Sequence, residues 1–127
     1  MDYADEGHPS QKYHEKSHGE SFLAVVQNQF KPNGMYILDE PEAALSPQRQ
    51  LTLLMEINEC VKEGSQFIIV SHSPILLGLP DAEILSFDEG AIHPCAYEDT
   101  DSYMVTSMFI NNREQLLRRL LGTREEE

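Results

Sequence analysis

The sequence has 127 residues, of which 40% are hydrophobic, and a net charge of −13 at pH 7. This length allows one domain at most, and the acidic balance argues against a whole-surface grip on DNA or anionic lipid. No apolar run approaches the roughly 18 to 20 residues of a membrane span, and the polar, acidic N-terminus is unlike a secretory signal. A local basic patch is still compatible with the sequence, at Arg113, Arg118, Arg119 and Arg124.

Hydrophobic spacing predicts a helix, a turn and a short strand early in the chain. Residues 1–15 have no periodic apolar face and are predicted to be irregular. Apolar residues recur at helical spacing from Glu20 to Phe30. The run Lys31-Pro32-Asn33-Gly34 ends that helix with a turn. The continuous apolar run Tyr36-Ile37-Leu38 is typical of a strand in a parallel sheet covered on both faces.

A second helix and a second strand complete a strand–helix–strand unit. Ser46 is a plausible N-cap with Pro47 at the first helical position, and Gly64 closes the helix. The run Gln66 to Val70 predicts another buried strand, and two strands joined by a helix are parallel with a right-handed crossover in nearly all cases. The apolar side of the helix is predicted to consist of Leu51, Leu54, Met55, Ile57 and Val61.

Shorter elements follow the second strand. Residues 75–79 are apolar and are predicted to be helical. The runs 83–87 and 91–93 flank Asp88-Glu89-Gly90, which predicts a β-hairpin.

The tail is predicted to form two successive helical segments. Residues 102–110 form the first segment, and Asn112 caps a restart with Gln115 three residues on, which is a capping-box pattern. Four leucines give the second segment a single apolar stripe, for which core packing is the preferred role and contact with a partner helix is the alternative: Leu116, Leu117, Leu120 and Leu121.

Polar residues follow both predicted parallel strands, where ligands bind in open α/β sheets. Asp39 and Glu40 end the first strand, and His72 follows the second. One carboxylate can contact Mg²⁺, which prefers oxygen ligands and keeps several waters. The other can polarise a water for in-line attack on a phosphate, and the histidine can hydrogen-bond that phosphate or the water. A polar strand exit without chemistry is the alternative, and the matching position of His72 argues against it.

Four motifs in order resemble those of ABC-type ATPases and cover residues 16 to 74. Tyr36 to Pro41 resembles the Walker B motif, and Ala43-Ala44-Leu45-Ser46-Pro47 resembles the D-loop. Ser71-His72-Ser73 resembles the H-loop, and Lys16 to Ser21 resembles a divergent signature motif. The residue sequences of these motifs resemble those of SMC-like soluble ATPases with an AAA-type core more than those of transporter subunits.

This resemblance implies a role for each matching residue. Asp39 would serve Mg²⁺, Glu40 would be the general base, and His72 would sense the γ-phosphate. Ser17 and Gly19 would bind the γ-phosphate of ATP held by an opposing subunit, at the head of a helix whose free N–H groups favour an anion.

Three residues depart from the family pattern. His18 replaces the first glycine of the usual signature, and Glu20 replaces its glutamine. Because a carboxylate facing phosphate would repel it, Glu20 is expected to point aside or to cap the helix. Ser46 stands where the D-loop usually has an aspartate, so no catalytic role is assigned to it.

The phosphate cradle Gly-x-x-x-x-Gly-Lys-Ser/Thr does not occur in the sequence, and none of the seven glycines is followed by Lys. The family's order places that loop before the signature. Residues 16–122 therefore resemble the C-terminal half of an ABC-type ATPase domain, with an acidic tail at 123–127. The expected fold class is α/β: a partial P-loop NTPase fold with a parallel βαβ core, a C-terminal β-hairpin and helices.

Without the cradle, the triphosphate loses most of its N–H donors and its lysine. We therefore expect the chain alone to bind ATP weakly or not at all and not to hydrolyse it. Absent sheet strands would also expose an apolar face, which a homo-oligomer or a chain supplying the Walker A half would cover. A truncated gene product or one subunit of a split enzyme would have this organisation.

Two other classes of function are alternatives to the ATPase half-domain. One is a non-catalytic interaction module that completes or regulates a partner ATPase, which the missing phosphate cradle favours. The other is a Mg²⁺-dependent nuclease or phosphatase, which lacks further acidic ligands at strand ends. Nothing in the sequence indicates a nucleic-acid partner. Cys60 and Cys95 have no metal or redox spacing, so reduced thiols in the cytoplasm are expected.

Overall fold

The computed structural model describes residues 23, 24 and 26–122. The chain divides into two compact units, with the division between Leu79 and Pro80. None of the helices in the described residues is long and apolar enough to cross a membrane.

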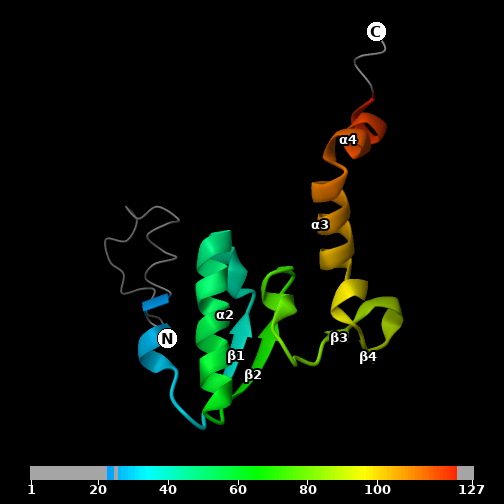
Figure 1. Cartoon of the computed structure of the whole chain (residues 1–127). Helices are drawn as coiled ribbons and strands as arrows, with labels where there is room; N and C mark the ends of the chain where they lie inside the picture. The colour runs from blue at the N-terminus through cyan, green and yellow to red at the C-terminus, as the bar shows by residue number, and fades with distance from the viewer. Residues whose placement is uncertain (1–22, 25, 123–127) are drawn as a thin grey trace. The chain divides into compact units, whose positions relative to one another are not determined.

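A parallel pair of strands joined by a helix forms the centre of the first unit (Figure 1). Strand β1 comprises Met35–Asp39, helix α2 comprises Pro47–Lys62, and strand β2 comprises Gln66–Val70. The two strands pair in register from Met35 opposite Gln66 to Asp39 opposite Val70. The predicted strand–helix–strand unit with a parallel sheet is therefore confirmed.

Local sequence determines where α2 begins and ends. Ser46 is the N-cap, and its hydroxyl oxygen accepts a hydrogen bond from the Arg49 backbone N–H at 3.2 Å. Pro47 takes the first helical position, where its lack of an N–H costs nothing. Gly64 follows the end of the helix with φ of +95°, a left-handed conformation that glycine adopts without steric cost.

The buried face of α2 differs from the predicted one. Leu53, Ile57 and Cys60 are buried, at the spacing of one face of a helix. The prediction missed Leu53. It was right for Ile57, and Leu54 is half-buried. It was wrong for three residues that are exposed, because they lie to the sides of the helix face that meets the core: Leu51, Met55 and Val61.

Residues 23, 24 and 26–29 are helical and contribute Leu23 and Val26 to the core. This agrees with the predicted helix over 20–30, whose earlier residues lie outside the described range. The core also includes buried residues from α2, from one loop and from a 3₁₀ turn, and its members are Leu23, Val26, Leu45, Leu53, Ile57 and Leu76.

The aromatic rings of Phe30, Tyr36 and Phe67 pack together beside this core. Their ring centroids are 4.7 to 5.2 Å apart. The Tyr36 hydroxyl oxygen accepts a hydrogen bond from the Lys31 N–H at 2.7 Å. These contacts join the predicted turn after the first helix to the sheet.

One face of the sheet is packed and the other is exposed. Leu38, Phe67 and Ile69 pack against the core. The alternate side chains point to the other face, where Ile37 is 69% exposed and Met35, Ile68 and Val70 are about half exposed. The predicted coverage of the sheet on both faces is thus not found among the described residues. The expected exposed apolar face is found.

A buried serine links the segments that precede the two strands. The Ser65 hydroxyl donates a hydrogen bond to the Lys31 carbonyl at 2.6 Å and accepts one from the Gly34 N–H at 2.9 Å. The thiol of Cys60 also donates to this hydroxyl, at 3.3 Å.

Residues 76–78 form a 3₁₀ turn, η3 (Leu76–Gly78), in the segment predicted to be helical.

The second unit contains the predicted hairpin with shorter strands than expected. Strands β3 (Leu85–Ser86) and β4 (His93–Pro94) pair antiparallel. The connection contains a 3₁₀ turn, η4 (Asp88–Gly90), and another 3₁₀ turn, η5 (Tyr97–Asp99), follows β4.

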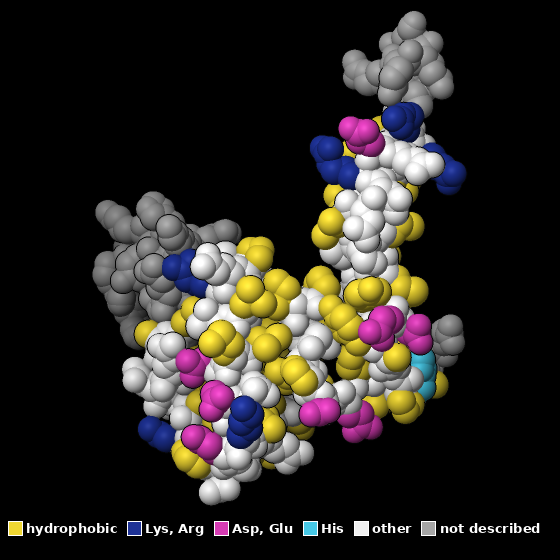
Figure 2. Space-filling model, in the orientation of Figure 1, with side chains coloured by type: hydrophobic (Ala, Val, Ile, Leu, Met, Phe, Trp, Pro, Cys, Tyr) yellow, Lys and Arg dark blue, Asp and Glu magenta, His cyan; other side chains and the backbone are white. Residues whose placement is uncertain are grey.

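Two helices end the described chain, α3 (Asp101–Asn111) and α4 (Arg113–Leu121). The Thr100 hydroxyl caps α3 by accepting a hydrogen bond from the Tyr103 N–H at 3.1 Å. The restart at Asn112 is confirmed but its capping box is wrong, because the Asn112 amide donates to the Met108 carbonyl instead. Hydrophobic side chains emerge on both sides of α3 (Figure 2), and none of its residues is buried.

The preferred role of the leucine stripe in α4 is wrong for its second half. Leu116 and Leu117 are half-buried, but Leu120 and Leu121 are 67% and 76% exposed. No residue of α4 is buried, so core packing does not account for Leu120 and Leu121.

Candidate functional site

The parallel pairing brings the predicted acidic and histidine residues to one edge of the sheet. Asp39 is opposite Val70 in the register, so the residues that follow each strand are neighbours. The Glu40 N–H continues the ladder by donating to the Val70 carbonyl at 2.7 Å. The expectation that the two strand ends meet is therefore confirmed.

Glu40 adopts an unusual backbone conformation. Its φ and ψ are 50° and 54°, in the left-handed region. This conformation costs a residue with a Cβ atom about 1–2 kcal/mol. Glu40 is also the N-cap of the 3₁₀ turn η2 (Pro41–Ala44), which begins with the buried Pro41. Strained backbone of this kind clusters at functional sites, which favours a functional role for Glu40.

The carboxylate of Glu40 and the imidazole of His72 lie near each other. Glu40 Oε2 is 3.8 Å from His72 Nδ1, and the two side chains are 52% and 79% exposed. This separation is longer than a direct hydrogen bond, so neither side chain is bonded to the other and both keep their polar atoms for a ligand. Both groups are open to solvent, so a ligand in water can reach them.

Asp39 adds a second exposed carboxylate at the same edge. Among the described residues, no three histidine, cysteine or acidic side chains converge to hold a metal ion. The donors here are carboxylate oxygens on consecutive residues, Asp39 and Glu40. This donor set suits Mg²⁺, which is commonly held by one or two carboxylates together with substrate phosphates and water.

Glu42 is a member of this edge that the sequence reasoning missed. Its Oε1 accepts a hydrogen bond from the Ser71 hydroxyl at 2.8 Å, and its Oε2 accepts one from the His72 backbone N–H at 2.8 Å. Both oxygens therefore contact the segment that carries the histidine. Glu42 is the third acid in Asp39-Glu40-Pro41-Glu42, and that repetition was the available signal.

A second set of hydrogen bonds restrains the residue after the histidine. The buried Ser73 hydroxyl donates to the Gln50 side-chain carbonyl and accepts from the N–H groups of Ile75 and Leu76. The Gln50 amide donates in turn to the Leu45 carbonyl at 3.2 Å. His72 thus lies between two serines that other elements fix.

The predicted contacts to ATP held by an opposing subunit, Ser17 and Gly19, lie outside the described residues, as do His18 and Glu20. Ser46, to which no catalytic role was assigned, uses its hydroxyl to cap α2.

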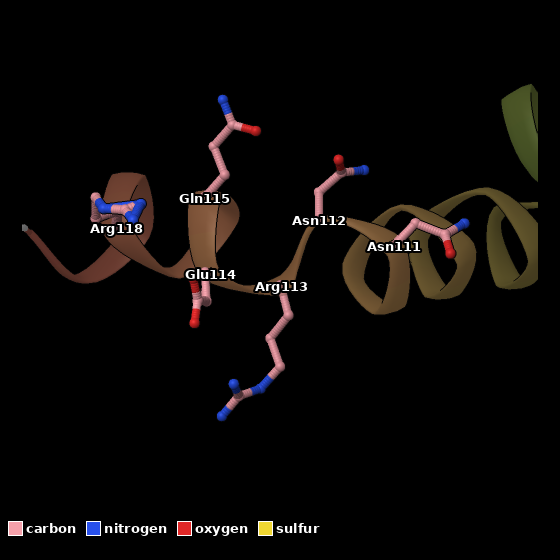
Figure 3. Close-up of a pocket in the computed structure, with 6 residues that line it drawn as sticks. All are labelled: Asn111, Asn112, Arg113, Glu114, Gln115 and Arg118. Carbon is pink, nitrogen blue, oxygen red and sulfur yellow. The ribbon is translucent and has the colours of Figure 1, made fainter.

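An open hollow lies at the junction of α3 and α4 (Figure 3), with a volume of about 540 Å³. Figure 3 shows Arg113 and Gln115 extending to opposite sides of the start of α4. Ligand sites are mostly apolar with a few convergent polar groups. This hollow has polar and charged residues that do not converge: Asn111, Asn112, Arg113, Glu114, Gln115 and Arg118.

The hairpin of the second unit contains a close acid–histidine pair. Asp88 Oδ1 is 2.8 Å from His93 Nε2. The hydrogen bond with His93 lowers the pKa of Asp88 from its ordinary value, and a hydrogen bond with Ser86 lowers it by a smaller amount. Desolvation and nearby carboxylates raise the pKa of the Cys95 thiol, and burial raises that of Tyr97. A raised pKa makes Cys95 a poorer nucleophile, so these groups do not suggest a second catalytic site.

Comparison with known families supports an ATPase-like region in the first unit. Residues 20–78, a little under half of the sequence, match the model of a family described as AAA domain, putative AbiEii toxin, Type IV TA system. The match includes β1, α2 and β2 with the acids and the histidine at their ends. The chain thus contains an AAA-type, P-loop ATPase-like region of α/β structure. No curated protein matches the sequence.

Proposed function

We propose that the first unit contributes the Mg²⁺ and water side of an ATP-hydrolysing site of ABC type. The observation that carries the proposal is the approach of Glu40 and His72, 3.8 Å apart, at the end of a parallel pair that also presents Asp39. The family match to an AAA-type domain supports nucleotide as the ligand class.

Each residue at this edge has a distinct role in the proposal. Asp39 contacts Mg²⁺, which when bound neutralises phosphate charge. Glu40 accepts a proton from the attacking water, and its exposed carboxylate is accessible to that water. His72 donates a hydrogen bond to the γ-phosphate, and its backbone is fixed while its ring is exposed. Ser17 and Gly19 remain predicted contacts to ATP held by an opposing subunit.

The proposal includes a second chain. The sequence contains no Gly-x-x-x-x-Gly-Lys-Ser/Thr cradle, so we propose that a different chain supplies the phosphate-binding loop, which a second copy of this sequence would lack as well. The exposed apolar face of β1 and β2 supports association, because burial of such a face is favourable.

A non-catalytic interaction module is the second candidate. The same missing cradle favours it, since a chain of this kind could complete or regulate a partner ATPase through shape alone. The two candidates differ at Asp39: only the ATPase proposal requires its carboxylate to bind a divalent ion.

Mn²⁺ used as a paramagnetic substitute for Mg²⁺ tests this difference in ¹H–¹⁵N spectra of the full chain. We expect the amide signals of Asp39, Glu40 and His72 to broaden before those at the other end of the sheet. Asp39→Asn should reduce this broadening. The matched control is Asp81→Asn, an exposed residue with φ of 62° that asparagine tolerates. Broadening that is the same in Asp39→Asn as in the wild-type chain would favour the interaction module.

Phosphate release from ATP tests the expected inactivity of the chain alone. No Mg²⁺-dependent release is expected, because the triphosphate lacks the cradle's donors. Release that Glu40→Gln abolishes would overturn this expectation and show that the chain forms a complete site by itself.

A further inference from the structure

We infer that Glu42 is the positioning residue of this site and sets the location of His72, an inference that rests on the proposed function. Three acids follow one another within Asp39-Glu40-Pro41-Glu42. Their surroundings separate them. Asp39 and Glu40 are exposed at the sheet edge, whereas Glu42 is half-buried in η2.

Both carboxylate oxygens of Glu42 are used within the protein. Oε1 accepts from the Ser71 hydroxyl and Oε2 from the His72 N–H, each at 2.8 Å. A carboxylate that binds two donors in this way is a poor choice for a metal ligand, because coordination would compete with both bonds. Hydrogen bonds to a charged group are also stronger than neutral ones.

The arrangement couples the ends of the two strands. η2 follows β1 directly, so its position depends on β1, and the two bonds from Glu42 transmit that position to the segment after β2. The Ser71 hydroxyl also accepts a hydrogen bond from the Ser73 N–H at 3.0 Å, so Ser73 belongs to the same hydrogen-bond network. The backbone of His72 is therefore fixed relative to Glu40, while its ring stays 79% exposed and can contact substrate.

Backbone amide exchange of the full chain tests the contact directly. In Glu42→Ala we expect the His72 amide to exchange at least about tenfold faster, since a bond to a charged acceptor is lost. Glu42→Gln should have a smaller effect because its one carbonyl oxygen can still accept. Glu59→Ala removes an equal charge from an exposed position on α2 and should leave His72 unchanged.

Mn²⁺ broadening separates positioning from a merely structural role. In Glu42→Ala, broadening at Asp39 should persist while broadening of the His72 ring signals falls. Ser71→Ala removes one of the two donors and should lie between wild type and Glu42→Ala, which keeps the test usable should Glu42→Ala fail to fold.

Two results would overturn the inference: His72 exchange within about twofold of wild type in Glu42→Ala, or unchanged His72 ring broadening despite faster exchange. Absence of Mn²⁺ broadening in the wild-type chain would instead count against the proposed function. In that case, amide exchange alone decides whether Glu42 positions His72.

Discussion

The imidazole Nδ1 of His72 lies 3.8 Å from Oε2 of Glu40, although the two residues follow different strands. The parallel register of β1 and β2 produces this approach. The hydrogen bond from the Glu40 N–H to the Val70 carbonyl extends the pairing of the two strands by one residue. The approach of a carboxylate and a histidine at a sheet edge is the geometric basis of the proposed site.

The strained backbone of Glu40 predicts that glycine at this position stabilises the first unit. Glu40→Gly removes the Cβ atom that disfavours φ of 50°, and relief of about 1 kcal/mol is expected after the added chain entropy is counted. Denaturant unfolding followed through signals of the first unit measures it. Glu59→Gly is the control in the interior of α2 and should destabilise by about 1 kcal/mol. Equal signs for the two changes would contradict the explanation.

Ser65→Ala should destabilise the first unit by about 1–3 kcal/mol. The change leaves the Gly34 N–H and the Lys31 carbonyl without their shared buried partner. The free energy of unfolding measures this loss. Ser107→Ala removes an exposed hydroxyl that also contacts a backbone carbonyl, at 3.3 Å, and should change stability by less than about 0.5 kcal/mol. A similar small effect at Ser65 would show that water replaces its bonds.

The buried face of α2 can be tested with two leucines. Leu53 has 0% exposure and Leu51 has 52%. Leu53→Ala should cost about 2–5 kcal/mol, because it leaves a cavity in the core, whereas Leu51→Ala should cost less than about 1 kcal/mol. Equilibrium unfolding in urea compares the two. The opposite ranking would mean that the helix presents its other side to the core.

The Asp88–His93 contact should make the hairpin sensitive to acid. Because the pKa of Asp88 is lowered from 3.8, the contact stabilises the folded hairpin above that pH and loses its effect as the pH falls through the lowered pKa. Exchange of the Cys95 N–H, which donates to the Ile84 carbonyl at 3.0 Å, reports on the hairpin. Relative to Asp88→Asn at the same pH, exchange should be slower near neutral pH and equal in acid. A constant difference at all pH values would exclude ionised Asp88 as the cause.

The exposed sheet face predicts self-association or binding of another chain. Ile37→Lys places a charge in the middle of that face, where Ile37 is 69% exposed, and should weaken self-association at least about tenfold, or by about 1.4 kcal/mol. Leu51→Lys adds the same charge on exposed α2 and should have little effect. Sedimentation equilibrium measures both, and a monomeric wild-type chain would count against a homo-oligomer.

Local sequence signals were sufficient for the elements but not for their contacts. The Ser46-Pro47 start of α2 and the turn before Gly34 depend on residues adjacent in the chain, so they could be predicted directly. The face of α2 could not, since Leu51, Leu53 and Leu54 are equally apolar and only packing against the sheet selects Leu53. The capping box at Asn112 was wrong, since the Asn112 side chain donates to the Met108 carbonyl and makes no capping hydrogen bond to α4.

The sequence by itself determined the strand–helix–strand order and the placement of Asp39, Glu40 and His72 at or just beyond the ends of the strands. These features follow from hydrophobic periodicity and from where apolar runs stop. Tertiary structure alone decided that Glu40 adopts a left-handed backbone and that the Glu42 carboxylate contacts the His72 segment instead of lying exposed beside Asp39 and Glu40. The physical reason is that hydrogen bonds between residues about thirty positions apart depend on strand register, which no local pattern encodes.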